Sequence, residues 1–70
     1  MKTKIEVVSS QMKTVEYDTE TNTLIITFNK GQKYKYANVP NKVFLELIEA
    51  SSIGGYFIKN IKTKYEYKLI

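Results

Sequence analysis

The stretch Thr23-Leu24-Ile25-Ile26-Thr27-Phe28-Asn29-Lys30-Gly31-Gln32-Lys33-Tyr34-Lys35-Tyr36 decides the fold. Its first six residues are rich in β-branched and aromatic side chains, which favour a strand with Leu24, Ile26 and Phe28 on one face. Gly31 closes a tight turn, because glycine tolerates a positive φ. Residues 33–36 alternate lysine with tyrosine, so this stretch predicts a β-hairpin with both tyrosines on one face.

The residues before this hairpin predict further strands. Residues 12–17 alternate, with Val15 and Tyr17 on one face, and the polar residues 18–22 are turn formers. Residues 4–7 also alternate and predict a short edge strand or an extended arm. Together these segments predict an antiparallel β-meander of three to four strands.

The pattern changes period after Asn38-Val39-Pro40, which ends the strand. Proline suits the first turn of a helix, and apolar residues in 41–50 recur at helical spacing. They are Val43, Phe44, Leu47 and Ile48. We therefore expect one main amphipathic helix that covers one face of the sheet.

Residues 51–61 predict a short second helix, because a serine can cap it and Tyr56, Phe57 and Ile61 would form its apolar face. Gly54 and Gly55 each disfavour a helix by about 1 kcal/mol relative to alanine, so they indicate a chain reversal or a close backbone approach. Residues 64–69 alternate again and predict a C-terminal strand. The expected fold is a single α+β domain over residues 1–70.

The composition argues against an enzyme. Histidine and cysteine are both absent, which removes the usual general base, the thiol nucleophile and the common zinc ligands. No phosphate-binding glycine motif of the Walker type occurs. We expect no catalytic residue, no metal and no cofactor.

The net charge of +4 comes from eleven basic residues, all of them lysine. Lysine attracts phosphate as a point charge, whereas reading of base edges is mostly done by arginine. The charge therefore favours contact with a nucleic-acid backbone over sequence reading. The alternative is that the lysines only keep a small protein in solution.

Several short blocks follow one another through the chain. They are Val8-Ser9-Ser10, Tyr17-Asp18, Tyr34-x-Tyr36-x-Asn38-Val39-Pro40, Val43-Phe44 with Leu47, Ala50-Ser51-Ser52-x-Gly54-x-Tyr56-Phe57, and Ile61-Lys62-x-x-Tyr65-x-Tyr67. In this order and spacing they resemble the KTSC domain over residues 5–70. That domain is named for its occurrence at the C-terminus of some lysyl-tRNA synthetases, and it also stands alone in small bacterial and phage proteins. Ile58 departs from the polar residue expected after the Tyr-Phe pair.

The resemblance implies an accessory role close to RNA, and in particular to tRNA, although it assigns no chemistry. No signal peptide is visible at the start, and no apolar run is long enough to span a membrane. We therefore expect a cytoplasmic protein, in the host cytoplasm if the chain is phage-encoded.

Lysine and tyrosine interleave in two segments, as they do in non-specific single-strand binders. The candidate nucleic-acid-binding residues are Lys33, Lys35, Lys59, Lys62, Lys64, Tyr65 and Tyr67. The alternative is that the tyrosines are buried and the lysines point outward, because neighbouring residues of a strand lie on opposite faces.

A small anion site is a second candidate. It would use serine hydroxyls and free amides at a helix start, from Ser51, Ser52, Gly54 and Tyr56. Such a site would suit a protein that sequesters a small nucleotide. The alternative is a capped turn that lets a short helix pack closely.

A protein-interaction module, such as a phage-type inhibitor of a host protein, is the second functional hypothesis. Ile25, Leu45, Ile58 and the uncovered side of the sheet motivate it. The expected state is a monomer or a homodimer, since an edge strand near residues 5–8 or 65–70 could pair two chains.

Overall fold

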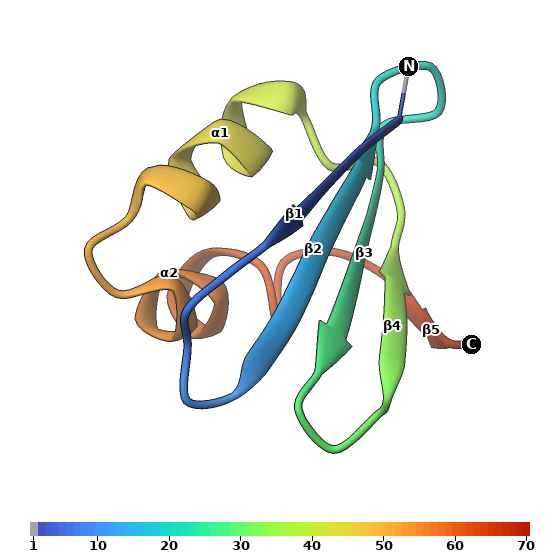
Figure 1. The fold of residues 1–70 in the computed structure, drawn as a ribbon. Coiled ribbons are helices and arrows are strands. Elements are labelled where there is room, and N and C mark those ends of the chain that lie inside the picture. Colours follow the sequence, from blue (N-terminus) through green and yellow to red (C-terminus); the bar gives the residue numbers. More distant parts are fainter. Residues whose placement is uncertain (1) are drawn as a thin grey trace.

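The fold of the chain comes from a computed structural model that describes residues 2–70 (Figure 1). Its elements are β1 (Lys2–Glu6), β2 (Met12–Asp18), β3 (Thr23–Phe28), β4 (Lys33–Tyr36), α1 (Asn41–Glu49), α2 (Ile53–Asn60) and β5 (Tyr67–Leu69). The strands form a five-stranded antiparallel sheet in the order β1-β2-β3-β4-β5. The predicted α+β meander is confirmed, but the count of three to four strands was too low. β1, predicted as a short edge strand or an extended arm, pairs with β2 along its full length, and β5 pairs with β4.

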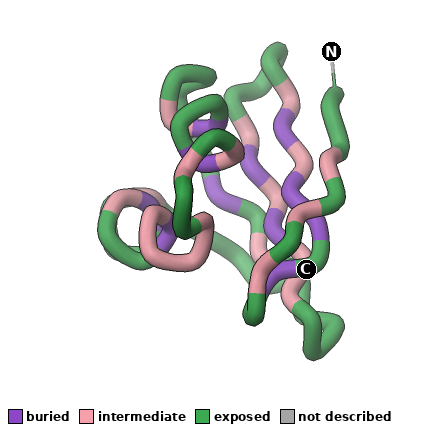
Figure 2. The backbone as a smooth tube through the Cα atoms, turned by 60° about the vertical axis from the view of Figure 1, so that its left-hand side comes forward, coloured by how far each residue is buried: buried purple, intermediate pink, exposed green. Residues whose placement is uncertain are grey.

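Both helices lie on one side of the sheet and leave the other side uncovered (Figures 1 and 2). The core fills the space between the helices and the covered face. Its fully buried side chains come from the sheet, from the segment between β4 and α1, from α1 and from the residue that follows α2. The largest are Tyr17, Tyr36, Met12, Leu24, Ile26, Leu47 and Ile61. The uncovered side is called the open face below.

A register shift in β2 decides which of its side chains reach the core. Met12 pairs with Phe28 while Thr14 pairs with Thr27, so Lys13 is an extra residue in β2. Such a bulge shifts the alternation by one position. Met12 therefore lies on the same face as Val15, although an odd number of positions separates them.

Helix α1 packs onto the sheet through the predicted apolar face. Pro40 is the residue before its first turn, and Phe44 and Leu47 are buried. The ring of Phe44 stacks on Tyr17 of β2, with centroids 4.9 Å apart and planes at 9°. The Tyr17 hydroxyl also donates a hydrogen bond of 2.6 Å to the Val39 carbonyl oxygen. This bond ties the sheet to the segment that leads into α1.

Helix α2 confirms the serine cap. Ser52 precedes its first turn, and the Ser52 Oγ accepts a hydrogen bond of 3.2 Å from the Gly55 N–H. A side chain added at Gly54 would meet the Gln11 and Ser9 side chains at 3.8 and 3.9 Å. These are ordinary contact distances, so Gly54 lies beside the β1–β2 connection without needing to be glycine; the tight position is Gly55, where an added Cβ would lie 2.9 Å from Ser52 Oγ. The alternative of a chain reversal at these glycines is wrong.

The predicted C-terminal strand begins later than expected, at Tyr67 instead of Lys64. The preceding residues continue from α2 as turns, because the N–H groups of Lys62, Lys64 and Tyr65 bond back to carbonyl oxygens of Phe57 or Ile61. These local hydrogen bonds override the alternation. Tyr65 therefore packs against the core from a turn and not from a strand.

Candidate functional site

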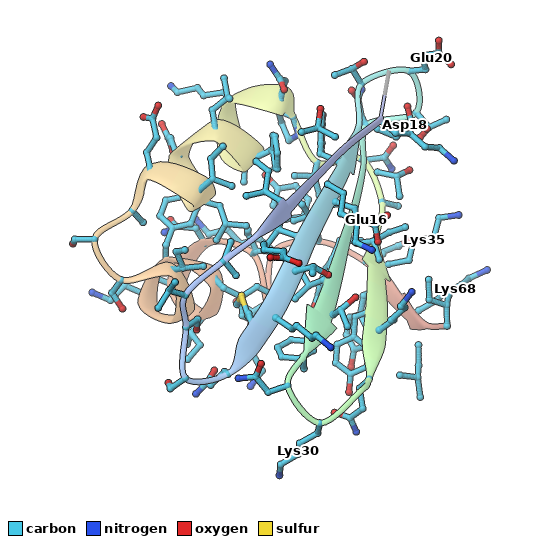
Figure 3. All side chains as sticks on the ribbon, viewed as in Figure 1. Glu16, Asp18, Glu20, Lys30, Lys35 and Lys68 are labelled. Carbon is cyan, nitrogen blue, oxygen red and sulfur yellow. The ribbon has the colours of Figure 1, made fainter. Side chains whose placement is uncertain are left out.

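The open face carries a group of lysines at its β4–β5 end. Lys35 and Lys68 are directly opposite each other across the two strands, and Lys33 lies two residues before Lys35 on the same side of β4. Figure 3 shows the side chains of Lys35 and Lys68 pointing away from the side that holds the helices. We call Lys33, Lys35 and Lys68 the lysine face.

The same row of the sheet has mixed charge at its other end. From β1 to β5 it reads Lys4, Glu16, Ile25, Lys35 and Lys68. The apolar Ile25 separates the carboxylate of Glu16 from Lys35. Positive charge is therefore concentrated on β4 and β5.

A groove of about 500 Å³ lies on the opposite, helix-covered side of the same strands. Five aromatic rings line it, and we call it the aromatic groove: Phe28, Tyr34, Tyr36, Phe57 and Tyr67. Gln11, Gln32 and Lys62 add polar groups to its wall. Its volume is within the range of small-ligand sites, about 300–1,000 Å³.

Contacts between the rings fix the shape of the groove. The Tyr67 ring lies 5.4 Å from that of Tyr34 and 5.5 Å from that of Tyr36. Phe57 meets Phe28 and Tyr36 edge-on, at 5.8 and 5.7 Å. Such contacts hold rings in defined orientations. Tyr67 nevertheless keeps 56% of its surface exposed, so part of its ring remains available.

Tyr36 is the most buried of the groove tyrosines, with 1% of its surface exposed. No group of the described residues hydrogen-bonds its hydroxyl, and that oxygen is not sealed from solvent. The hydroxyl therefore accounts for at least part of the small exposed surface of Tyr36, a residue that lines the groove. Burial, followed by the nearby Tyr67 and Tyr34, raises the pKa of Tyr36 to about 12. The hydroxyl therefore remains neutral and able to donate at neutral pH.

The structure divides the predicted nucleic-acid-binding residues between two sides. Lys33 and Lys35 lie on the open face, whereas Lys62 and Tyr67 line the aromatic groove. The other three, Lys59, Lys64 and Tyr65, lie at the end of α2 and in the turns that follow it and do not line the groove. The alternative based on alternation is correct for β4, where tyrosines face the helices and lysines face outward.

Sequence reasoning missed Lys68 and the two phenylalanines of the groove. The alternation Tyr67-Lys68 was a usable signal for Lys68, but its position opposite Lys35 depends on the β4–β5 register. The sequence patterns explain Phe28 as an apolar residue of a strand and Phe57 as an apolar residue of a helix, and both line the groove. Nothing in the sequence indicates that they line one cavity.

The candidate anion site is partly assembled. Ser51, Ser52 and Gly54 line a hollow of about 320 Å³ against the β1–β2 connection. Tyr56 does not join them, because its hydroxyl donates a hydrogen bond of 2.6 Å to Glu46 Oε1 on α1. Burial and this carboxylate raise the pKa of Tyr56 to about 12. Binding of an anion or a small nucleotide at this hollow stays a prediction.

The three apolar residues behind the protein-interaction hypothesis lie on different elements. Leu45 is exposed on α1 and Ile58 is exposed on α2. Ile25 is half-buried on the open face of β3. They do not form one patch.

Within residues 2–70, no cluster of three histidine, cysteine or acidic side chains is placed to hold a metal ion. In the same range, neither α1 nor α2 is long and apolar enough to cross a bilayer.

Comparison with known proteins gives consistent results over almost the whole chain. A family model described as "KTSC domain" matches residues 8–65. A lysine–tRNA ligase from Trichormus variabilis is 42% identical over 59 residues, which cover 84% of this chain and 10% of that enzyme. An uncharacterized protein from Stutzerimonas stutzeri is 32% identical over 62 residues and is matched over 87% of its length.

The fold is also similar to a solved structure. The crystal structure of a KTSC domain protein from Yersinia pestis superposes with a TM-score of 0.92 at 30% identity. The alignment covers 100% of this chain and 99% of that one. The chain spans about a tenth of the length of the ligases that it matches.

Proposed function

This chain belongs to the KTSC domain family, and from that premise we propose that it is a non-catalytic accessory module that binds RNA through lysine–phosphate contacts. The observation that carries the proposal is the lysine face. Like charges directly opposite each other on neighbouring strands are destabilising, so the position of Lys68 against Lys35 has an energetic cost in the free protein. A polyanion on this face would offset that cost.

The relatives support RNA as the polyanion. Several are lysine–tRNA ligases by name, and this chain matches a segment equal to 10% of such an enzyme. So short a segment is compatible with an accessory domain. The absence of arginine supports contact with the phosphate backbone over reading of bases by hydrogen bonds.

Lysines on the helix side extend the proposal. Lys62 lines the aromatic groove. Lys59 and Lys64 are exposed and lie close to Lys62 in the sequence. We expect a smaller contribution from these residues, because they do not share the flat surface of the lysine face. Tyr65 is expected to contribute least, since it packs against the core.

The direct test is fluorescence anisotropy with labelled tRNA and with single-stranded RNA over a series of salt concentrations. The variant replaces Lys33, Lys35 and Lys68 by glutamine, and a matched control replaces three exposed lysines elsewhere, Lys13, Lys30 and Lys42. Both triple variants lower the net charge of +4 by the same three units. General attraction is therefore equal in the two proteins.

We expect the wild type to bind with a log affinity that falls linearly with log salt. The lysine-face variant should lose affinity and should reduce the slope by roughly 2, because each single-strand phosphate contact contributes about 0.7 to it. The control variant should keep most of the wild-type affinity and most of the wild-type salt slope. Equal losses in the two variants would show non-specific attraction, and an absence of binding at low salt would end the proposal.

A protein partner is the second candidate, favoured by the exposed apolar end of β5. Leu69 keeps 63% of its surface exposed and Ile70 keeps 59%, next to an edge strand that could accept another strand. A pull-down with and without nuclease separates the two candidates. A stoichiometric partner that survives nuclease and is lost on Leu69→Lys substitution would favour this function, including its form as an inhibitor of another protein.

A further inference from the structure

We propose that the aromatic groove holds one unpaired base of an RNA strand, with an adjacent phosphate at Lys62. This inference rests on the proposed function, because it takes RNA as the ligand. It adds a second site, on the opposite side of the sheet from the lysine face, and a second kind of contact. The groove lies between β4–β5 and the end of α2, and its walls are the rings described above.

Tyr67 is placed to stack on a base. More than half of its surface is exposed, while Tyr34 and Tyr36 hold its ring at 5.4 and 5.5 Å. The ring therefore has little freedom to lose when a ligand binds. Stacking on an aromatic side chain tolerates any base, because every base has a π-face. This tolerance agrees with a lysine-rich chain that lacks arginine.

The Tyr36 hydroxyl indicates a polar ligand. It has no hydrogen-bond partner among the described residues, and it belongs to a groove-lining residue of which only 1% is exposed. A buried hydroxyl is normally hydrogen-bonded, and covering it with an apolar side chain would leave it unsatisfied. The edge of a base can accept its hydrogen bond while the base ring stacks on Tyr67. An aliphatic side chain of a protein partner could not do both.

The groove and the lysine face meet at the edge of the sheet. Tyr67 also lines a second hollow, of about 270 Å³, whose other walls include Lys35 and Lys68. Tyr67 and Lys68 are consecutive residues of β5, which has no neighbouring strand on its outer side. An RNA strand that crosses this edge can therefore place phosphates against the lysines and one base in the groove.

Backbone amide spectra recorded by NMR during titration with short oligo(A) and oligo(U) ribonucleotides test the inference. We expect shifts at Tyr34, Tyr36, Tyr67 and Lys62 in addition to those on the lysine face. Tyr67→Ala should weaken binding roughly fivefold or more, the equivalent of one lost stacking contact. Tyr36→Phe removes only a hydroxyl that has no protein partner, and should weaken binding about twofold to tenfold without loss of stability.

Leu69→Ala is the matched control, because Leu69 is exposed on the same face of β5 but does not line the groove. It should leave binding unchanged, and circular dichroism should show all three variants folded. Shifts confined to Lys33, Lys35 and Lys68, with unchanged affinity of both tyrosine variants, would overturn the base site and leave the proposed function intact. Absence of binding by the wild type would overturn both.

Discussion

Lys35 of β4 and Lys68 of β5 face each other in direct antiparallel register on the side of the sheet that carries no helix (Figure 3). The chain lacks arginine, so both positions present a compact ammonium group. Two such groups on facing positions repel each other. Their repulsion opposes stability, and on the proposed function a bound phosphate would offset it.

Lys68→Glu should stabilise the free protein and weaken its binding to RNA. The substitution replaces a like-charge pair by an opposite-charge pair, which contributes roughly 0.2–1 kcal/mol across a strand pair. Urea denaturation measures the change in the free energy of unfolding, and anisotropy with single-stranded RNA measures the change in affinity. Lys30→Glu, in the β3–β4 turn, is the control for net charge. A destabilised Lys68→Glu protein, or one that binds RNA as the wild type does, would contradict the assignment.

The serine cap of α2 should be measurable on its own. Ser52→Ala removes the hydroxyl that accepts the Gly55 N–H, and it should lower the free energy of unfolding by about 1 kcal/mol. Ser51→Ala is the control, because Ser51 is exposed and precedes the cap. Thermal and urea denaturation should separate the two. If Ser51→Ala proves equally destabilising, the stabilising role of the pair is not the cap.

The two glycines of α2 should respond differently to alanine. At Gly54 an added Cβ would meet its nearest neighbours at 3.8 and 3.9 Å, which is ordinary contact. Gly54→Ala should therefore stabilise the protein by up to about 1 kcal/mol through helix propensity. At Gly55 the added Cβ would lie 2.9 Å from Ser52 Oγ and disturb the cap.

Gly55→Ala should consequently stabilise less than Gly54→Ala, or destabilise. Differential scanning calorimetry of the two variants compares them directly. The prediction fails if Gly55→Ala is the more stable protein. A stabilised Gly54→Ala protein would also show that stability alone does not explain a glycine at the wall of the serine hollow.

Alkaline pH should destabilise the protein through Tyr36. Its pKa is raised from 10.0 to about 12 in the folded state, so the folded chain holds a proton that the unfolded chain releases earlier. This contribution to stability is complete below about pH 10 and is lost as the pH rises toward 12. Tyr36→Phe removes this effect and leaves every other ionisable side chain in place.

Between about pH 10 and pH 12, the free energy of unfolding of the wild type should therefore fall relative to that of Tyr36→Phe. Denaturation at a series of alkaline pH values measures the difference. The tyrosinate absorbance of the wild type should also show late titration of Tyr17, Tyr36 and Tyr56, whose pKa values are all raised, mainly by burial. A constant difference between the two proteins would contradict the prediction.

Local patterns in the sequence predicted most of the fold. The β3–β4 hairpin and α1 follow from alternation, a glycine with a φ of 95° in the turn, and helical spacing of apolar residues. These signals lie within about ten residues of chain, where intrinsic preference and burial agree. The start of β5 was wrong because the turns after Ile61 satisfy the backbone locally, which an alternating pattern cannot reveal.

The candidate site was less predictable, because its parts come from distant segments. Lys35 and Lys68 are opposite each other only because of the β4–β5 register. The groove brings together Phe28, Tyr36 and Phe57, which come from three separate elements. Alternation correctly separated tyrosines from lysines on β4, but it did not indicate that two surfaces result. The prediction therefore named lysines and tyrosines by type, whereas their grouping on two surfaces depends on the sheet register.

β5 is the shortest strand of the described sheet. This strand has three residues, all exposed, and pairs with the sheet along one side only. Segments held by so few contacts open long before a domain unfolds as a whole, and hydrogen exchange at β5 should reveal this. Detachment of this strand would remove the stacking ring and one lysine together while the core remained intact. On the proposed function, detachment of β5 would therefore release the bound RNA.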